Sequence, residues 1–199
     1  MGTVMTGFTM SLDGFIADRN DGVEPLFRWY ESGPIEYTFP SGTMKAHVSE
    51  ESLAVLKALN EGTGAIVTGR RLFDITNGWD GRHPEDVPIV VLTHEVPEAW
   101  IEKHPDAPFT FVTESLARAV EEGRRLAGEK TLALAGADVA QQAIRAGLVD
   151  EIGVELAPVL LGEGIRFFDN LGPGVIELEN TMVVDAPGIV HLRYRVLKG

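Results

Sequence analysis

The sequence predicts an α/β fold: a three-layer domain with a mostly parallel central sheet, helices on both faces of that sheet and an antiparallel hairpin at the C-terminus. Three observations predict it. Short apolar runs such as "PIVVLT" (Pro88–Thr93) alternate with helical segments along most of the chain, which is typical of parallel sheets. Two such runs pass directly into a helix through glycine, at Gly69 and Gly136. The last third alternates apolar and polar residues around the turn "DAPG", which indicates a hairpin.

The N-terminal half begins with a strand over Thr3–Met10 and a turn at Ser11–Gly14, where Asp-Gly is a favoured turn pair. Phe15–Ala17 is extended again. Residues 18–48 are irregular and carry aromatic side chains among turn residues, and a segment of this length in a compact domain is usually a functional loop. Ser49 is then a suitable N-cap for a helix over Glu50–Glu61.

The middle of the chain predicts alternating strands and helices. In order, we expect a strand at Ala65–Thr68, a helix that starts at Gly69, strands at Pro88–Thr93 and Phe109–Val112, a helix capped by Thr113 that runs to Ala127, a strand at Thr131–Ala135 and a helix at Asp138–Ala146.

The C-terminal hairpin joins Val175–Val184 to Ile189–Val196. If its turn closes symmetrically about Ala186, Glu179 faces Arg193 and Glu177 faces Arg195. Opposite charges directly across such a pair contribute roughly 0.2–1 kcal/mol each, so we interpret these residues as structural.

Length and composition indicate one globular domain over residues 1–199, with 44% hydrophobic residues and a net charge of −13. That charge argues against nucleic-acid binding, which depends on Lys and Arg neutralising phosphates. No stretch approaches the roughly 18 apolar residues of a membrane helix, and the N-terminus has no signal-peptide pattern, which favours the cytoplasm. There is no cysteine, the five histidines have no metal-ligand spacing, and "DRNDG" places its glycine one residue early for a calcium loop. We therefore expect no metal site.

Anion binding is predicted at both strand–helix junctions. The segment "IVTGRRLFD" places Arg70 and Arg71 where a strand gives way to a helix, and a guanidinium grips a phosphate with two hydrogen bonds. The segment "LALAGADVAQQ" directs the first N–H groups of a helix past Gly136. The alternatives are that the arginines cover a surface and that small residues serve close helix–strand packing. Two such junctions in one sheet fit a dinucleotide such as NADP better than a mononucleotide.

Together these segments resemble the dihydrofolate reductase-like superfamily, closest to the reductase domain of the riboflavin-biosynthesis deaminase/reductase and its stand-alone relatives. The segments that carry the resemblance span nearly the whole chain: "SLDGFIA" from Ser11, "VTGRRLFD" from Val67, "PIVVLT" from Pro88, "LAGADVAQQ" from Leu134 and "GLVDEIGVELAPVLLGEGIRFF" from Gly147.

The resemblance implies NADPH lying across the strand ends, with the protein a homodimer. Arg70 or Arg71 would read the 2′-phosphate, the residues after Ala135 would cradle the pyrophosphate, and two residues would lie near the nicotinamide. The residues implied are Thr9 and Ala17 near the nicotinamide, Gly69, Arg70 and Arg71 at the adenosine-side phosphates, Thr93 near the adenosine ribose, and Gly136, Ala137, Asp138 and Val139 at the pyrophosphate.

Three departures from the family pattern stand out. Leu72 replaces the usual threonine, so one hydroxyl near the phosphates is lost. Ala135-Gly136 replaces a Gly-Gly pair that is often joined by a cis peptide, and a non-proline cis bond costs roughly 2.5–4 kcal/mol. Neither Glu50 nor Glu51 can be matched to the helix acid of the folate enzymes.

We therefore predict hydride transfer from NADPH to a small heterocyclic or ribosyl substrate, with the proton from Asp13 or water. The ring of Trp29 or Tyr30, or that of Phe27, would stack on a flat substrate, although these aromatics could equally anchor the loop or a dimer interface. Arg28, Lys45 and Arg166 are candidate partners for a substrate phosphate. The alternatives are a dihydrofolate reductase or another NADPH reductase on this fold, and a nucleotide-binding protein without catalysis.

Overall fold

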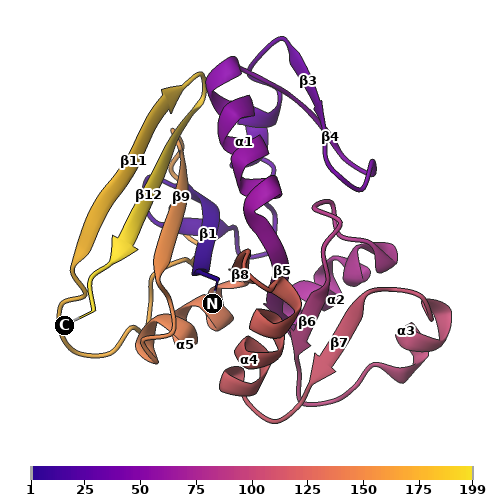
Figure 1. The fold of residues 1–199 in the computed structure, drawn as a ribbon. Helices are drawn as coiled ribbons and strands as arrows, with labels where there is room; N and C mark the ends of the chain where they lie inside the picture. Colours follow the sequence, from indigo (N-terminus) through magenta and orange to yellow (C-terminus); the bar gives the residue numbers. More distant parts are fainter. Residues whose placement is uncertain (1, 199) are drawn as a thin grey trace.

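A computed structural model describes residues 2–198 and contains one eight-stranded sheet in the order β11-β12-β9-β1-β8-β5-β6-β7 (Figure 1). The six strands from β9 to β7 in this order are parallel to their neighbours, and β12 and β11 continue the sheet as antiparallel strands. The predicted fold class is confirmed. The strands are β1 (Val4–Ser11), β5 (Thr63–Gly69), β6 (Ile89–Leu92), β7 (Phe109–Val112), β8 (Thr131–Ala135), β9 (Glu151–Ala157), β11 (Leu178–Ala186) and β12 (Ile189–Val196).

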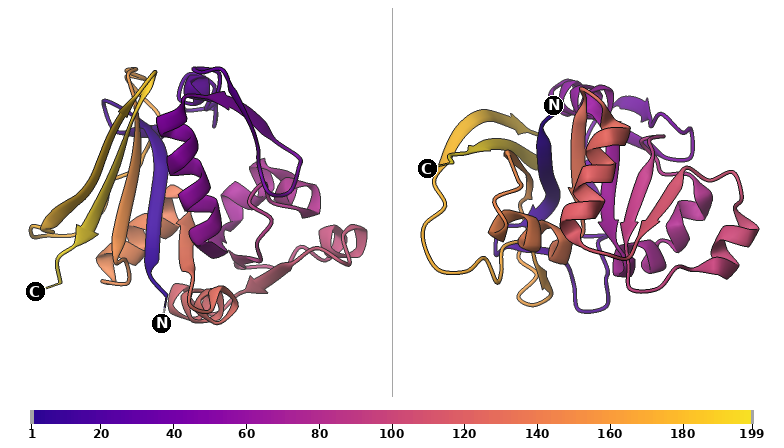
Figure 2. Two further views of the ribbon diagram at one scale, coloured as in Figure 1. Left: turned by 45° about the horizontal axis from the view of Figure 1, so that its top comes forward. Right: turned by 60° about the horizontal axis from the view of Figure 1, so that its bottom comes forward.

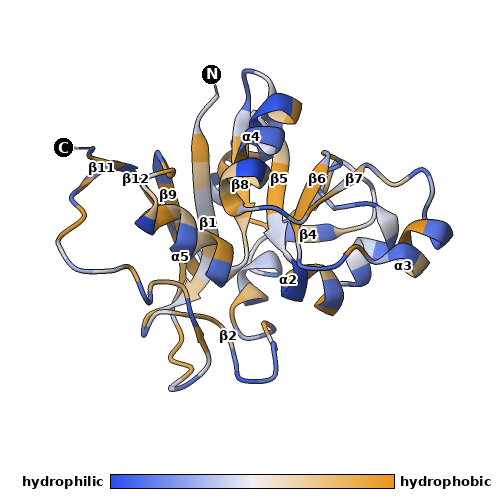
Figure 3. Cartoon of the chain, turned by 90° about the horizontal axis from the view of Figure 1, so that it is seen from below, coloured by the Kyte–Doolittle hydropathy of each residue, from blue (hydrophilic) through white to orange (hydrophobic). Residues whose placement is uncertain are grey.

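Helices cover both faces of the sheet because alternate residues of each central strand point to opposite sides. Ala65 and Val67 of β5 pack in the core beneath α4 and α5, whereas Ile66 between them packs with Phe73 of α2. In Figure 3 the strands β5 and β6 are strongly apolar, while α3 and α4 carry many hydrophilic residues. The helices are α1 (Glu50–Gly62), α2 (Arg70–Ile75), α3 (Glu98–Lys103), α4 (Leu116–Ala127) and α5 (Ala137–Arg145).

The C-terminal hairpin has a different register from the predicted one. Ala186 pairs with Ile189, so only Pro187 and Gly188 form the loop, and an irregularity between Asn180 and Met182 shifts the pairing further along. Glu179 therefore faces Arg195, with Nη1 and Oε2 2.6 Å apart, and the expected pairs Glu179–Arg193 and Glu177–Arg195 are wrong. The yellow hairpin lies at one end of the sheet and α3 near the other (Figure 2).

Residues 18–48 are more ordered than the sequence predicts. A 3-10 turn η1 (Phe27–Tyr30) precedes a hairpin of β3 (Ile35–Thr38) and β4 (Lys45–Val48), which stands beside α1. Their apolar side chains form a second core with α1 and the C-terminal strands: it includes Leu26, Trp29, Phe39, Val48, Leu56 and Ile189. A short pair of strands, β2 (Phe15–Ala17) and β10 (Ile165–Arg166), and a 3-10 turn η2 (Asn77–Gly81) complete the described elements.

The helix starts test the capping predictions. Ser49 is the N-cap of α1 and its hydroxyl accepts from the Ser52 N–H, as predicted. The cap of α4 is Ser115, whose hydroxyl accepts from the Arg118 N–H, so the prediction of Thr113 is wrong. Within residues 2–198, no helix combines the length and apolar character needed to cross a membrane.

Candidate nucleotide-binding site

The candidate site lies where two adjacent parallel strands send the chain in opposite directions. β5 leads through α2 to β6 on one side, and β8 leads through α5 to β9 on the far side of β1. The two strands are in register with Thr68 beside Ala135, so Gly69 and Gly136 follow at the same edge. In open α/β sheets, the crevice at such a point is where ligands bind.

A local physical reason favours glycine at each of these two positions. Gly136 has φ of 99°, a backbone conformation that favours glycine, and it is the N-cap of α5. A Cβ on Gly69 would lie 3.3 Å from Val139 Cγ2, so this junction is closely packed as well. Within residues 2–198 no side chain caps α5 and all peptide bonds are trans, that between Ala135 and Gly136 included. The first N–H groups of α5 are therefore available to an anion.

A cavity of about 910 Å³ opens at this point. All ten residues predicted to hold a cofactor line it, although they come from three strands, two helices and the loops between them. They are Thr9, Ala17, Gly69, Arg70, Arg71, Thr93, Gly136, Ala137, Asp138 and Val139. Phe8, Ile16, Phe27 and Trp79 add apolar walls, and Leu72 also lines the cavity.

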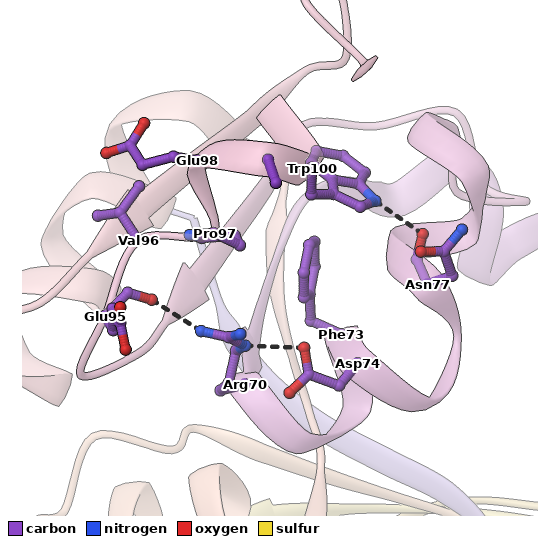
Figure 4. A pocket seen from close by; sticks show the side chains of 10 residues that line it. Arg70, Phe73, Asp74, Asn77, Glu95, Val96, Pro97, Glu98 and Trp100 are labelled. Atoms are coloured by element: carbon purple, nitrogen blue, oxygen red, sulfur yellow. Dashed lines mark hydrogen bonds and ion pairs between the residues drawn. The ribbon is translucent and has the colours of Figure 1, made fainter. Parts of the chain in front are cut away.

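The Arg70 guanidinium is held in place by its neighbours. Nε donates to Asp74 Oδ1 at 2.7 Å, and Nη1 donates to the Glu95 carbonyl at 2.8 Å and to Thr93 Oγ1 at 3.2 Å. Arg70 also lines a second cavity of about 540 Å³, toward which the rings of Phe73 and Trp100 face (Figure 4). Its side chain thus stands between two cavities.

Arg71 makes a contact that sequence reasoning missed. Its Nη2 donates to both carboxylate oxygens of Asp21 at 2.9 Å, and its Nε donates to Oδ1 at 3.2 Å. Asp21 belongs to the turn after β2, fifty positions earlier in the chain, and it lines the same cavity. No sequence pattern links the two residues.

Asp13 anchors a loop and does not line the larger cavity. Its carboxylate accepts from Ser11 Oγ at 2.6 Å, from the Gly162 N–H at 2.7 Å and from the Leu161 N–H at 3.2 Å. The hydrogen bond from Ser11 holds the pKa of Asp13 below its ordinary value, which stabilises the ionised form. The structure therefore does not support Asp13 as a proton donor. Instead, the Asp13 carboxylate joins the turn after β1 to the loop after β9.

Trp29 and Tyr30 lie in the second core. Trp29 is 2% exposed and its ring meets His191 edge to face at 5.3 Å, and burial raises the pKa of Tyr30. Neither lines the larger cavity, which argues against the prediction that they stack on a substrate. Phe27, the third aromatic residue predicted there, does line it. An apolar ring in a loop predicts burial or ligand contact equally well, so the sequence could not separate the three.

The three candidate phosphate partners lie outside the cavity lining. Arg28 is 3.9 Å from Glu24, Lys45 is 2.9 Å from Glu36, and both pairs are exposed. Arg166 stacks over the Phe15 ring at 4.5 Å and donates to the Asp13 carbonyl. The helix acids Glu50 and Glu51 are exposed on α1 and do not line the cavity either.

A buried polar chain fixes α1 to the sheet. Ser52 Oγ lies 2.9 Å from His191 Nε2, His191 Nδ1 contacts Glu155, and Glu155 Oε1 is 2.6 Å from Arg193 Nη2. Ser52 and His191 are 0% exposed. We therefore interpret these four linked side chains as part of the structure of the second core. In the sequence these residues are scattered over α1, β9 and β12, without a spacing that would connect them.

The fold and the cavity define a class: an α/β domain of the dihydrofolate reductase-like fold with a ligand cavity at the switch point of its sheet. Within that class, the chain belongs to the RibD C-terminal domain family, whose model matches residues 2–190. This is a reductase family, and the predicted resemblance is confirmed.

Solved structures show the same fold. A putative riboflavin biosynthesis protein from a Shewanella species is 21% identical with a TM-score of 0.72, over 98% of this chain and 99% of that one. A pyrimidine reductase-like protein from Corynebacterium diphtheriae is 18% identical with a TM-score of 0.59, over 100% and 93%. RibD from Acinetobacter baumannii is 16% identical with a TM-score of 0.63, and the match covers 99% of this chain but 58% of that longer one. A search of the curated proteins finds no match.

Proposed function

We propose that this chain is an NADPH-dependent reductase of the riboflavin-pathway type, acting on a ribosylaminouracil phosphate or a related small heterocycle. One observation carries the proposal: the residues that the resemblance assigns to the cofactor, taken from distant segments, line one cavity at the switch point of the sheet. Membership of a reductase family supports the reaction class.

The residues present suit a dinucleotide. Arg70 and Arg71 supply cationic donors from α2, and the uncapped N-terminus of α5 supplies backbone N–H groups. Such groups favour phosphate because the helix dipole and the unpaired donors act together. A volume of about 910 Å³ lies within the range of small-molecule and cofactor sites.

Each part of the cavity then has its own task. Arg70 would hold the adenosine 2′-phosphate, and Ala137, Asp138 and Val139 would hold the pyrophosphate through their N–H groups. Thr9 and Ala17 would position the nicotinamide, which supplies hydride when bound. Phe27 offers a ring against which a flat substrate can stack. Because Asp13 is committed to the loop after β9, we assign the proton to water.

The test is a titration of NADPH and of NADH followed by tryptophan fluorescence. Trp79 lines the cavity and reports binding, while a Trp79→Phe variant identifies the quenched residue. We expect NADPH to bind more tightly than NADH and Arg70→Ala to weaken NADPH by about tenfold or more, because a hydrogen bond to a charged group contributes roughly 1.5–3 kcal/mol. Absence of binding by either nucleotide would refute the proposal.

The reaction itself is tested by NADPH oxidation with ribosylaminouracil phosphate and with dihydrofolate. Oxidation with the first alone supports the riboflavin-type reductase, and oxidation with the second supports a folate reductase on the same fold. Binding without oxidation of any substrate would indicate a nucleotide-binding protein that lacks catalysis. We also propose a homodimer, which sedimentation equilibrium tests.

A further inference from the structure

Asp21 binds Arg71, one of the two arginines that the proposed site offers to the phosphates of a nucleotide. The Arg71 guanidinium bonds both oxygens of the Asp21 carboxylate, with contacts of 2.9, 2.9 and 3.2 Å. This two-pronged geometry is the one that arginine also uses for phosphate. Both side chains line the larger cavity, so the ion pair lies at the site itself.

The turn that presents Asp21 is organised without help from Arg71. Asp18 Oδ1 accepts from the N–H groups of Asn20 at 2.7 Å and Gly22 at 2.8 Å, and the Asp18 N–H donates to the Gly22 carbonyl at 2.9 Å. A Cβ on Gly22 would lie 2.5 Å from Asp18 Oδ2, so the turn closes tightly there. Arg19 ties the same turn to Glu163 at 2.7 Å. The carboxylate of Asp21 is therefore held at a defined place.

The two partners differ in their exposure to solvent. The Arg71 side chain is 68% exposed and that of Asp21 is 24% exposed. An anion from solvent can therefore reach the Arg71 guanidinium, but the donors that it would use are already bonded to the Asp21 carboxylate. The phosphate and the Asp21 carboxylate would compete for the same N–H donors of Arg71, and their negative charges repel each other.

We propose that Asp21 is an internal competitor for Arg71, which a nucleotide phosphate must displace, so that this carboxylate sets the affinity of the site. The inference rests on the proposed function and deepens it. Displacement frees the turn at residues 18–22 from α2 while Arg19 and the Asp18 contacts keep its shape. Asp21 thereby weakens binding of any ligand that uses Arg71 through a phosphate.

The magnitude follows from the nature of the pair. Exposed ion pairs stabilise by an amount equivalent to about a one- to fivefold change in an equilibrium constant, and removal of the carboxylate also removes its repulsion. We therefore expect Asp21→Asn to tighten NADPH by about two- to fivefold. The gain should shrink as salt rises, because the interaction is screened.

The experiment compares wild type with Asp21→Asn, Arg71→Ala, the double variant and a matched control, with NADPH and inorganic pyrophosphate as probes. The control is Asp86→Asn: Asp86 also has a positive φ, 55° against 64° for Asp21, and also holds an arginine with both oxygens, yet neither Asp86 nor Arg82 lines the cavity. Circular dichroism checks that each variant is folded.

We expect tighter binding of NADPH and pyrophosphate in Asp21→Asn and no change in Asp86→Asn. In the Arg71→Ala background we expect a smaller gain from Asp21→Asn, because only the direct repulsion is then removed. Unchanged or weaker NADPH binding in Asp21→Asn would overturn the inference while leaving the proposed function in place. If neither wild type nor any variant binds a nucleotide, both fall together.

Discussion

Glu85 gives the sharpest test of the energetics of this fold. Its Oε2 is shielded from solvent and has no hydrogen-bond partner among residues 2–198, and burial raises the pKa of Glu85 from an ordinary 4.5 to about 7. The polar Thr63 side chain opposes that shift. Glu85→Gln keeps the shape of the side chain and removes its ability to ionise.

The sign of the effect follows from proton binding. Because the pKa of Glu85 is higher in the folded state, the unfolded chain releases this proton first as pH rises. The free energy of unfolding contributed by Glu85 therefore falls between about pH 4.5 and pH 7 and stays low above pH 7. The gap between the two pKa values corresponds to about 3 kcal/mol, at roughly 1.36 kcal/mol per pH unit.

A neighbouring histidine changes in the opposite sense. Burial lowers the pKa of His83 from 6.5 to about 4, so its contribution to stability rises with pH between those values. The two contributions oppose each other in wild type over the shared range. The difference between Glu85→Gln and wild type at each pH removes the contribution of His83 and leaves that of Glu85.

Guanidinium unfolding at pH 4.5, 6 and 8 measures this difference. We expect Glu85→Gln to gain about 3 kcal/mol relative to wild type between pH 4.5 and pH 8, and the exposed Glu61→Gln control to show no such trend. Parallel pH profiles for Glu85→Gln and wild type would show that Glu85 is not desolvated in the folded protein and refute the reasoning.

Three further predictions concern stability. Asp13→Asn should lower the denaturant midpoint at neutral pH, and the gap from wild type should narrow as pH falls below the ordinary aspartate pKa of 3.8, because the pKa of Asp13 is held lower by Ser11; a gap that widens as the solution is acidified would contradict this. Ser49→Ala should cost about 1 kcal/mol through loss of the α1 cap, with Ser49→Asp as the rescuing control in the same unfolding assay. Trp29→Ala should cost about 3–5 kcal/mol through a cavity in the second core, and a stable variant that loses only substrate turnover would instead restore the stacking role.

The parts of the fold that could be predicted depend on local chemistry. Apolar runs such as Ile89–Leu92 indicate buried strands, and Ser49 marks a helix start because a side-chain oxygen satisfies a free N–H. Gly69 and Gly136 stand out because a helix follows each at once. Parallel strands bring their carboxyl ends to one edge, so residues predicted from separate motifs meet in one cavity.

The parts that could not be predicted depend on contacts between distant residues. The hairpin turns at Pro187 and Gly188 and not about Ala186, and the irregularity between Asn180 and Met182 then shifts the register by one residue, although the alternation of the two strands is visible in the sequence. The side-chain direction of Asp13 decides between anchoring a loop and reaching a ligand, and a turn motif leaves that direction open. The pairing of Asp21 with Arg71 arises only once the turn after β2 lies beside α2.

The position of Arg70 between two cavities has a consequence for inhibitor design. Arg70 lines the larger cavity and also the smaller one of about 540 Å³, whose lining includes Phe73 and Trp100. A compound that fills the larger cavity and extends past the guanidinium would gain contacts with Phe73 and Trp100, which line the smaller cavity and not the larger one. Such a compound should bind more tightly than a ligand confined to the larger cavity, because part of its binding energy comes from burying apolar surface of the smaller one.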